Sequence, residues 1–186
     1  MTLLKVRRLE LCDLESRVCW LNSPDVYRRM TVTVPLSLEE TKRWYVGTLL
    51  NTSRHDLAFS LEDSGSLRVV AMGGVTDISL THRHAEIYIL VDPCLTGKGI
   101  GGKAVQWLCT WAFVSLGLKR VYLHTTGQNE PARRLYDRLG FVREGILRSH
   151  LWHQGRHVDR HVQGLLREEW ARQTWYQESL QMEIEL

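Results

Sequence analysis

The spacing of apolar residues changes several times along the chain, and each change predicts a different element. Alternating or continuous apolar runs are typical of strands. They occupy residues 5–11, 56–61, 67–78, 85–91 and 121–125, and a further strand pair within 141–166 turns near Gln154 and Gly155. The run at 85–91 (AEIYILV) is apolar enough to predict a central strand covered on both faces. Apolar residues at helical spacing occupy residues 14–21, 24–29, 38–50, 101–116 and 130–139.

Capping residues mark the ends of three predicted helices. Ser37 is followed three residues later by Glu40, which forms a capping box and predicts a helix start. Gly117 and Gly140 directly follow helical patterns, where a glycine commonly ends a helix. The order of elements predicts an α/β fold, with a mixed central sheet of about seven strands flanked by helices on both faces. We expect residues 1–170 to form a single domain and residues 171–186 to form a polar tail or helix.

Composition and charge exclude several classes of protein. The chain has 186 residues, of which 44% are hydrophobic, and a net charge of +3. These values suit one globular domain, and the mild charge gives no reason to expect a nucleic-acid or membrane partner. The amino-terminal residues carry charges where a signal peptide needs an apolar run. The four cysteines form no CxxC pair, which favours reduced thiols and a cytoplasmic location.

Three histidines raise the question of a metal site. His153, His157 and His161 are spaced by four residues, which on a helix would place them on one face. The residues around them alternate like a strand, and this spacing along a strand separates the side chains. We therefore expect no metal.

A glycine-rich turn is the strongest local signal for ligand binding. Gly97, Gly99, Gly101 and Gly102 lie within six residues between a buried strand and a helix. Such a turn presents successive backbone N–H groups, and the helix N-terminus adds its positive dipole end. The turn lacks the hydroxyl residue after Lys103 that a Walker A loop needs, and no acidic residue follows at the distance typical of a Rossmann fold. We interpret it as a phosphate cradle, because a plain turn needs only one or two glycines.

Two segments resemble one protein family. The pattern Thr96-x-x-Gly99-x-Gly101 resembles the Gln/Arg-x-x-Gly-x-Gly/Ala signature of the GNAT acetyltransferase superfamily, with Thr96 in the first position. Residues 129–141 (NEPARRLYDRLGF) are similar to its N-x-x-A-x-x-x-Y-x-x-x-G-F segment. Residues 20–26 and 37–40 resemble the branch that contains ribosomal-protein alanine, spermidine and amino-sugar acetyltransferases. The resemblance implies a GNAT-like fold and acetyl-CoA as co-substrate.

The resemblance also implies where the cofactor binds. In this family a strand and the following turn contact the pantetheine arm and the pyrophosphate through backbone groups, and the tyrosine of the second motif donates a proton to the CoA sulfur. Tyr136 occupies the tyrosine position. The cofactor-binding residues implied are Ile89, Leu90, Val91, Thr96, Gly97, Lys98, Gly99, Ile100, Gly101, Gly102 and Asn129.

Two residues are candidates for the general base that removes a proton from the acceptor. His124 lies five residues before Asn129, where ribosomal-protein alanine acetyltransferases carry a glutamate, and histidine titrates near neutral pH. Glu86 lies on the predicted central strand, where other members carry a glutamate base, and shares a face with Tyr88. Both candidates stay open. The resemblance places the acceptor pocket against the amino-terminal helices, with Trp20, Tyr27, Arg28 and Trp44 as lining candidates.

The sequence therefore predicts an N-acetyltransferase that passes the acetyl group directly to a primary amine of a small molecule. Amino sugars, polyamines and amino-acid-like amines are the acceptor classes considered. Two alternatives remain open, namely a protein N-terminal acetyltransferase of the ribosomal-protein type and a non-catalytic acyl-CoA-binding sensor. Members of the branch often dimerise, so a homodimer is also left open.

Overall fold

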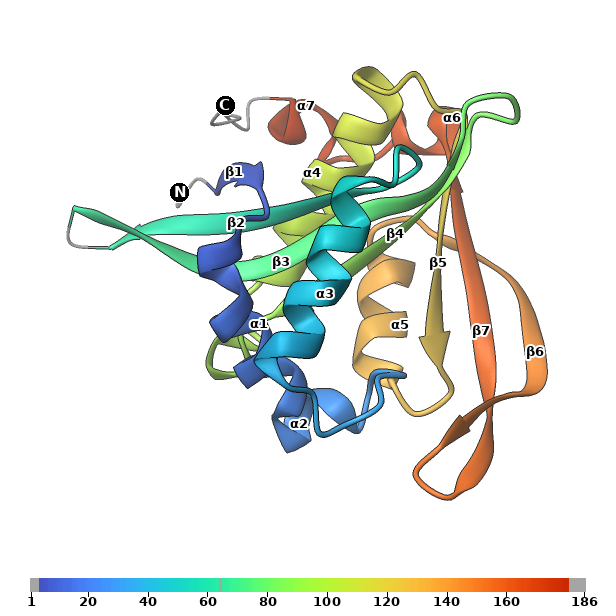
Figure 1. The fold of residues 1–186 in the computed structure, drawn as a ribbon. Helices are drawn as coiled ribbons and strands as arrows, with labels where there is room; N and C mark the ends of the chain where they lie inside the picture. The colour runs from blue at the N-terminus through green and yellow to red at the C-terminus, as the bar shows by residue number, and fades with distance from the viewer. Residues whose placement is uncertain (1–3, 64, 181–186) are drawn as a thin grey trace.

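A seven-stranded sheet in the order β1-β2-β3-β4-β5-β7-β6 forms the centre of the protein (Figure 1). The computed structural model describes residues 4–63 and 65–180. The strands are β1 (Lys5–Arg8), β2 (His55–Asp63), β3 (Ser66–Ser79), β4 (His84–Val91), β5 (Arg120–Thr126), β6 (Val142–His153) and β7 (Arg156–Leu166). Neighbouring strands are antiparallel except β4 and β5, which are parallel. The predicted α/β fold with a mixed sheet is confirmed.

Helices cover both faces of this sheet (Figure 1). One face carries α1 (Leu14–Asn22), α2 (Pro24–Tyr27) and α3 (Leu38–Leu49). The other face carries α4 (Ile100–Val114), α5 (Glu130–Arg138) and the one-turn helices α6 (Arg167–Trp170) and α7 (Tyr176–Ser179). Two short 3₁₀ helices, η1 (Leu11–Asp13) and η2 (Pro93–Leu95), connect strands to the helices that follow them.

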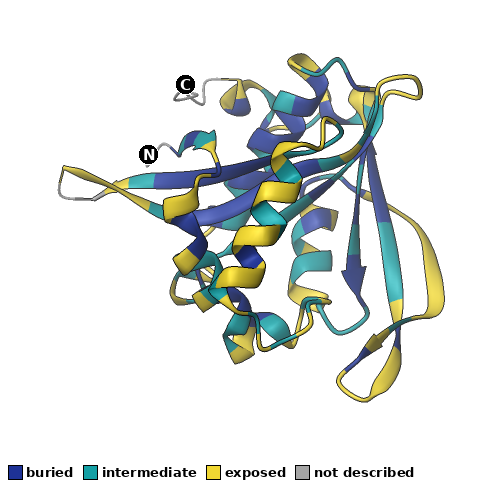
Figure 2. Cartoon of the chain, viewed as in Figure 1, coloured by how far each residue is buried: buried dark blue, intermediate teal, exposed yellow. Residues whose placement is uncertain are grey.

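Strand alternation sends side chains into two separate apolar clusters. Ala85 and Ile87 of β4 pack in the larger cluster beneath α4, whereas Leu90 packs with Met72 beneath α1 and α3. Figure 2 shows the central strands buried and the edge strand β6 largely exposed. Burial on both faces explains why β4 is the most continuously apolar strand of the sequence.

The predicted caps and turns have the expected geometry. Oγ of Ser37 accepts a hydrogen bond from the N–H of Glu40 at 3.1 Å, and the Glu40 carboxylate accepts one from the N–H of Ser37 at 2.9 Å. Gly117 and Gly140 have φ values of 65° and 90°. Both are positive values, at which a glycine ends a helix without steric cost. The capping box and both glycine stops are therefore confirmed.

The structure shortens the first predicted strand and gives detail at the end of the chain. The first strand ends at Arg8, because the Asp13 carboxylate accepts hydrogen bonds from the Arg7 guanidinium and from the N–H of Glu10, which turns the chain into η1. For residues 171–186 the sequence predicts a polar tail or helix. The described part of this stretch contains the one-turn helix α7, which follows α6, and Trp170 and Trp175 are buried. Residues 181–186 lie outside the described chain. Within the described residues, no helix is both long and apolar enough to cross a membrane.

The two parallel strands separate soon after they meet. β4 and β5 pair only from His84 to Glu86 on one strand and from Arg120 to Tyr122 on the other. β5 keeps β7 as its antiparallel neighbour along its whole length, so beyond Tyr122 it diverges from β4 (Figure 1). The carboxyl ends of adjacent parallel strands are a common place for ligand sites in α/β proteins. A ligand site is therefore expected where β4 and β5 diverge.

Candidate active site

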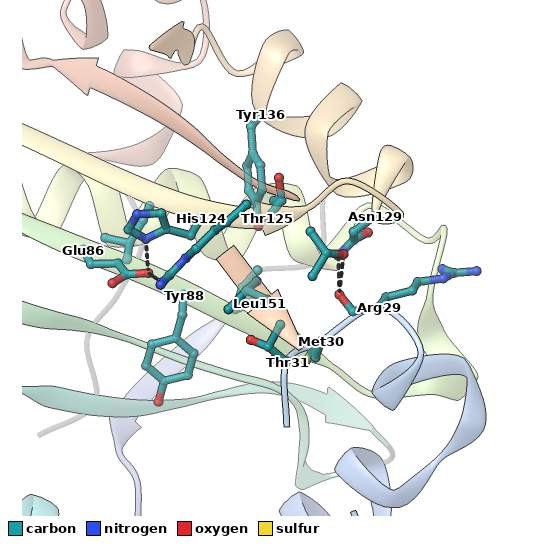
Figure 3. Close-up of a pocket in the computed structure, with 14 residues that line it drawn as sticks. Arg29, Met30, Thr31, Glu86, Tyr88, His124, Thr125, Asn129, Tyr136 and Leu151 are labelled. Atoms are coloured by element: carbon teal, nitrogen blue, oxygen red, sulfur yellow. Dashed lines mark hydrogen bonds and ion pairs between the residues drawn. The ribbon is translucent and has the colours of Figure 1, made fainter. Parts of the chain in front are cut away.

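A cavity of about 180 Å³ lies where β4 and β5 diverge. Its walls come from both strands, from α5, from β6 and β7, and from the segment that follows α2 (Figure 3). The fourteen lining residues are Arg29, Met30, Thr31, Glu86, Ile87, Tyr88, Ile89, His124, Thr125, Thr126, Asn129, Tyr136, Leu151 and Arg160. All three predicted catalytic residues are among them.

Glu86 and His124 are bonded to each other on one wall of the cavity (Figure 3). Glu86 is the partner of Tyr122 across the strand pair, so His124 lies two residues further along β5 on the same face. Nδ1 of His124 lies 2.8 Å from Oε1 of Glu86, and each side chain is 18% exposed. Nη2 of Arg160 lies 3.7 Å from the same oxygen. The carboxylate orients the imidazole, leaves its Nε2 available, and stabilises a positive charge on the ring.

Tyr136 reaches the cavity from α5. This helix covers the face of the sheet opposite to the one on which the Glu86–His124 pair lies. The side chain of Tyr136 is only 6% exposed and packs against Phe141, with ring centroids 5.7 Å apart. Burial raises the pKa of its hydroxyl above the ordinary value for tyrosine, so the hydroxyl stays protonated at neutral pH. A group held in the gap between the strands therefore has a proton donor on one side and a proton acceptor on the other.

Asn129 ties α5 to the segment that follows α2. Its Oδ1 caps the helix by accepting a hydrogen bond from the N–H of Ala132 at 3.3 Å. Its Nδ2 donates to the carbonyl of Arg29 at 3.4 Å, and the Thr126 hydroxyl donates to the same carbonyl at 3.4 Å (Figure 3). These hydrogen bonds hold the segment that follows α2 against the carboxyl end of β5 and the start of α5.

The glycine turn follows the carboxyl end of β4, and its residues do not line the cavity. Gly97 and Gly99 have φ values of +84° and +82°, which other residues rarely adopt. A Cβ atom at Gly101 would approach Cγ2 of Val91 to 3.2 Å, so a glycine lets α4 start close to β4. The first N–H groups of α4 have no carbonyl one turn earlier, and the helix dipole adds positive potential there. This geometry suits a bound diphosphate.

The strand residues expected to contact the cofactor point in different directions. Ile89 lines the cavity, and Val91 is half-buried on the side of α4. The side chain of Leu90 is buried on the other side of the sheet. A contact made by backbone groups does not depend on the direction of a side chain, so the roles of these residues stay predictions. The exposed residues of the turn are Thr96, Gly97, Lys98 and Gly99.

None of the four residues expected to line the acceptor pocket is among the residues that line the cavity. Trp20 is 7% exposed and packs in the apolar cluster beneath α1, and Trp44 packs against that cluster from α3. Tyr27 ends α2, and Arg28 follows it. The chain then reaches the cavity with residues 29–31. Acceptor-binding roles for the four residues stay predictions.

The sequence pattern of the Acetyltransferase (GNAT) domain family matches residues 4–142. The match runs from before β1 to the start of β6, so it includes the diverging strands, the glycine turn and Tyr136. This chain belongs to the GNAT acetyltransferase family. The predicted family, the GNAT-like fold, the N-acetyltransferase class and acetyl-CoA as co-substrate are thereby confirmed.

Similar proteins of known or assigned activity fall within the branch that the sequence predicted. The spermidine N(1)-acetyltransferase of Vibrio cholerae is 32% identical over 114 residues, which span 60% of this GNAT chain and 65% of the relative. The putative ribosomal N-acetyltransferase YdaF of Bacillus subtilis is 36% identical over 94 residues, 50% of this chain and 51% of YdaF. The structure of the Vibrio cholerae spermidine N-acetyltransferase with CoA and spermine matches with a TM-score of 0.82 and 25% identity, over 91% of this chain and 98% of that chain. The chain thus aligns with about half of YdaF and 65% of the Vibrio cholerae relative in sequence, and the structural match covers 98% of the Vibrio cholerae chain.

Arg160 and Tyr88 are among the polar residues of this GNAT cavity that were not predicted as site residues. Arg160 reaches it because β7 pairs with β5, where Arg160 is the partner of Thr126. This register is a tertiary feature that no local pattern in the sequence reports. Tyr88 shares the strand face of Glu86, and alternation along β4 was a signal that could have found it.

Tyr88 connects the cavity to a buried network beneath α1 and α3. Its hydroxyl donates a hydrogen bond to Asp56, and Arg54 binds both oxygens of that carboxylate at 2.7 and 2.8 Å. The guanidinium of Arg17 lies 4.1 Å from the ring centroid of Trp44. Burial lowers the pKa of Arg17, and burial together with the negative charge of Asp56 raises the pKa of Tyr88. In this network Asp56 is bonded to the guanidinium of Arg54, and its negative charge opposes the effect of burial on the pKa of Arg17.

The three histidines spaced by four residues have separate surroundings. Nε2 of His153 donates to the carbonyl of Arg28 at 3.1 Å. The ring of His157 packs against Trp152, with centroids 4.9 Å apart, and His161 lies further along β7. Across residues 4–63 and 65–180, no group of three or more His, Cys, Asp or Glu side chains is arranged to hold a metal ion.

Proposed function

We propose that this GNAT protein transfers the acetyl group of acetyl-CoA directly to a primary amine of a small molecule. The observation that carries the proposal is the meeting of Tyr136 with the Glu86–His124 pair, from opposite faces, in the gap between β4 and β5. The relatives named for spermidine make a polyamine one acceptor class, beside amino sugars and amino-acid-like amines. The four cysteines are free thiols, which supports a cytoplasmic location.

The site must first produce a neutral amine. An alkylammonium with a pKa of about 10.4 is neutral in only about one molecule in 10³ at pH 7, a deficit of about 4.6 kcal/mol. Nε2 of His124 accepts the ammonium proton, because Nδ1 of the same ring is bonded to Glu86. Glu86 acts as the positioning residue, since its carboxylate orients the ring and balances the positive charge that the ring acquires.

The second task is to bring a proton to the departing sulfur. Acetyl-CoA supplies the acetyl group as an activated thioester. As the carbon–nitrogen bond forms and the carbon–sulfur bond breaks, the amine nitrogen loses a proton and the Tyr136 hydroxyl gives one to the sulfur. The second proton lost by the nitrogen restores Tyr136 through solvent, and His124 releases the first one to solvent, so each turnover frees one proton and closes the cycle. Backbone groups of β4 beyond Glu86 have no partner on β5 and are placed to polarise the thioester carbonyl.

The diphosphate end of the cofactor fits the turn that follows β4. The turn from Thr96 to Gly102 and the start of α4 bind the diphosphate with backbone N–H groups. Ile89 and Asn129 line the cavity between this turn and the Glu86–His124 pair, so they border the pantetheine arm.

An acetylation assay with purified protein tests the proposal. Acetyl-CoA is incubated with amino acids, polyamines and amino sugars, free thiol is followed with time, and products are identified by mass spectrometry. We expect one acetylated amine for each thiol released, and a much slower reaction with His124→Ala. If coenzyme A binds but no amine is acetylated, the sensor alternative stands in its place. If peptide N-termini react in preference to every small amine, the protein-directed alternative does.

A further inference from the structure

The charged side chains on the cavity wall are mostly basic. Arg29 and Arg160 are cations, and Glu86 is the one carboxylate among the lining residues of the described chain. Oε1 of Glu86 already accepts from His124 and lies 3.7 Å from Arg160. The guanidinium of Arg29 extends away from this pair (Figure 3). The wall therefore offers no second carboxylate to an acceptor that carries several ammonium groups.

The layer behind Tyr88 has the same excess of positive charge. The Asp56 carboxylate is occupied by both nitrogens of Arg54 and by the Tyr88 hydroxyl. Nη1 of Arg17 is buried there, and it has no hydrogen-bond partner among the described residues. Like charges in a partly buried region repel more strongly than in water. A polyamine would place its remaining ammonium groups against this basic surface.

Arg160 is the cation closest to the reacting position. Its Nη2 and Nδ1 of His124 both lie within 4 Å of the same carboxylate oxygen of Glu86. Nη1 is 3.5 Å from Nε2 of His150, so these two long contacts leave most of the five guanidinium N–H donors available. A guanidinium binds a carboxylate or phosphate with two parallel hydrogen bonds.

We propose that the acceptor carries an anionic group a few bonds from its amine, as an amino acid does, and that Arg160 binds this group. The proposal rests on the proposed function and narrows its acceptor. The small separation between the base and the guanidinium requires the amine and the anion to be close together.

Matched acceptors separate the effect of the anion from that of the amine. We would measure kcat/KM for the common amino acids, for their carboxamides, for the amines formed by removing the carboxyl group, and for spermidine. The preferred amino acid should exceed its own carboxamide by about tenfold or more, since a hydrogen bond to a charged group contributes this much. Spermidine should be slower than the preferred amino acid.

Variants assign the preference to one side chain. Arg160→Gln should bring the ratio of amino acid to carboxamide close to one, and Arg160→Lys should restore part of it because the charge is kept. Arg43→Gln is the matched control, because Arg43 is exposed on α3 and does not line the cavity. The control should keep the wild-type ratio and the wild-type rate.

The outcomes separate this proposal from the function on which it rests. If spermidine or the carboxamides react faster than every amino acid, the anionic acceptor is overturned and the acetyltransferase function stands. If amino acids are preferred but Arg160→Gln leaves the ratio unchanged, the role of Arg160 is overturned. If coenzyme A binds and no member of the panel is acetylated, the acceptor class is overturned. If amino sugars are not acetylated either, the function is overturned as well.

Discussion

The two sides of the cavity are built in different ways. On the proposed cofactor side, the glycine turn and the α5 segment are each continuous in sequence, and the roles proposed for them need only backbone N–H groups and one tyrosine, Tyr136. On the acceptor side, Glu86, His124 and Arg160 come from three strands, and the segment that follows α2 adds residues 29–31. A ligand held by backbone groups needs a local chain conformation, whereas a set of side chains needs the whole sheet to be in register.

The largest expected effect tests the acceptor side. His124→Ala removes the proposed base and should lower kcat/KM by roughly 10²–10⁴-fold. Glu86→Gln should lower it less, since the amide keeps a hydrogen bond to the ring. The double variant should be little worse than His124→Ala alone, because residues that act as a unit are not additive. Steady-state kinetics with the preferred amine measures all three.

His82→Ala provides the control, because His82 is exposed in the turn before β4 and lies outside the cavity. It should leave the rate unchanged. If His124→Ala keeps nearly full activity while Glu86→Gln loses it, Glu86 is the base and the assignment of roles in the pair is reversed.

The next effect tests the cofactor side. Tyr136→Phe removes one hydroxyl and should lower kcat by about 10²-fold, with little change in coenzyme A affinity. Because burial raises the pKa of Tyr136, its proton is present below about pH 10 and is lost only above that value. The wild type and the variant should therefore have pH–rate profiles of the same shape at neutral pH.

Tyr176→Phe is the matched control, since Tyr176 loses the same hydroxyl on α7, outside the cavity. A change in profile near neutral pH for Tyr136→Phe alone would show that Tyr136 titrates there and would contradict the effect of burial.

The same contrast explains how much the sequence could predict. The glycine turn and Tyr136 were found because each lies in a segment whose residues meet along a single turn and helix. Glu86 and His124 were found as separate candidates, but their bond depends on the register that sets Glu86 beside Tyr122. Arg160 depends on the pairing of β7 with β5, which local spacing does not encode. The choice between a tail and a helix at residues 171–186 stayed open for a related reason, because the local pattern does not report the burial of Trp175 against the core.

A smaller effect tests whether the cofactor side acts through chain conformation. Gly99→Ala places a side chain at a φ of +82°, which costs about 1–2 kcal/mol. If relaxing the turn removes the cradle, the dissociation constant of coenzyme A should rise by about tenfold, which corresponds to about 1.4 kcal/mol. Calorimetric titration measures it.

Gly47→Ala is the matched control, because Gly47 lies within α3 and a Cβ atom there meets nothing within 4 Å. This change should stabilise the protein by about 1 kcal/mol and leave the affinity unchanged. Equal affinities for wild type and Gly99→Ala would mean that the turn does not bind the cofactor.

The smallest effect tests how the acceptor side is held in place. Ser37→Ala removes the cap of α3, the helix that follows the segment carrying residues 29–31, and should cost about 1 kcal/mol of unfolding free energy. Asn22 still binds both backbone groups of Leu36 at 2.8 Å, so the segment stays anchored and KM for the amine should rise only slightly. Thr52→Ala, at an exposed position after α3, should change stability by less than about 0.5 kcal/mol. Thermal unfolding measures the change in stability, and steady-state kinetics on the same samples measures KM for the amine. If Ser37→Ala weakens coenzyme A binding as much as amine binding, the two sides of the cavity are coupled and the contrast between them does not hold.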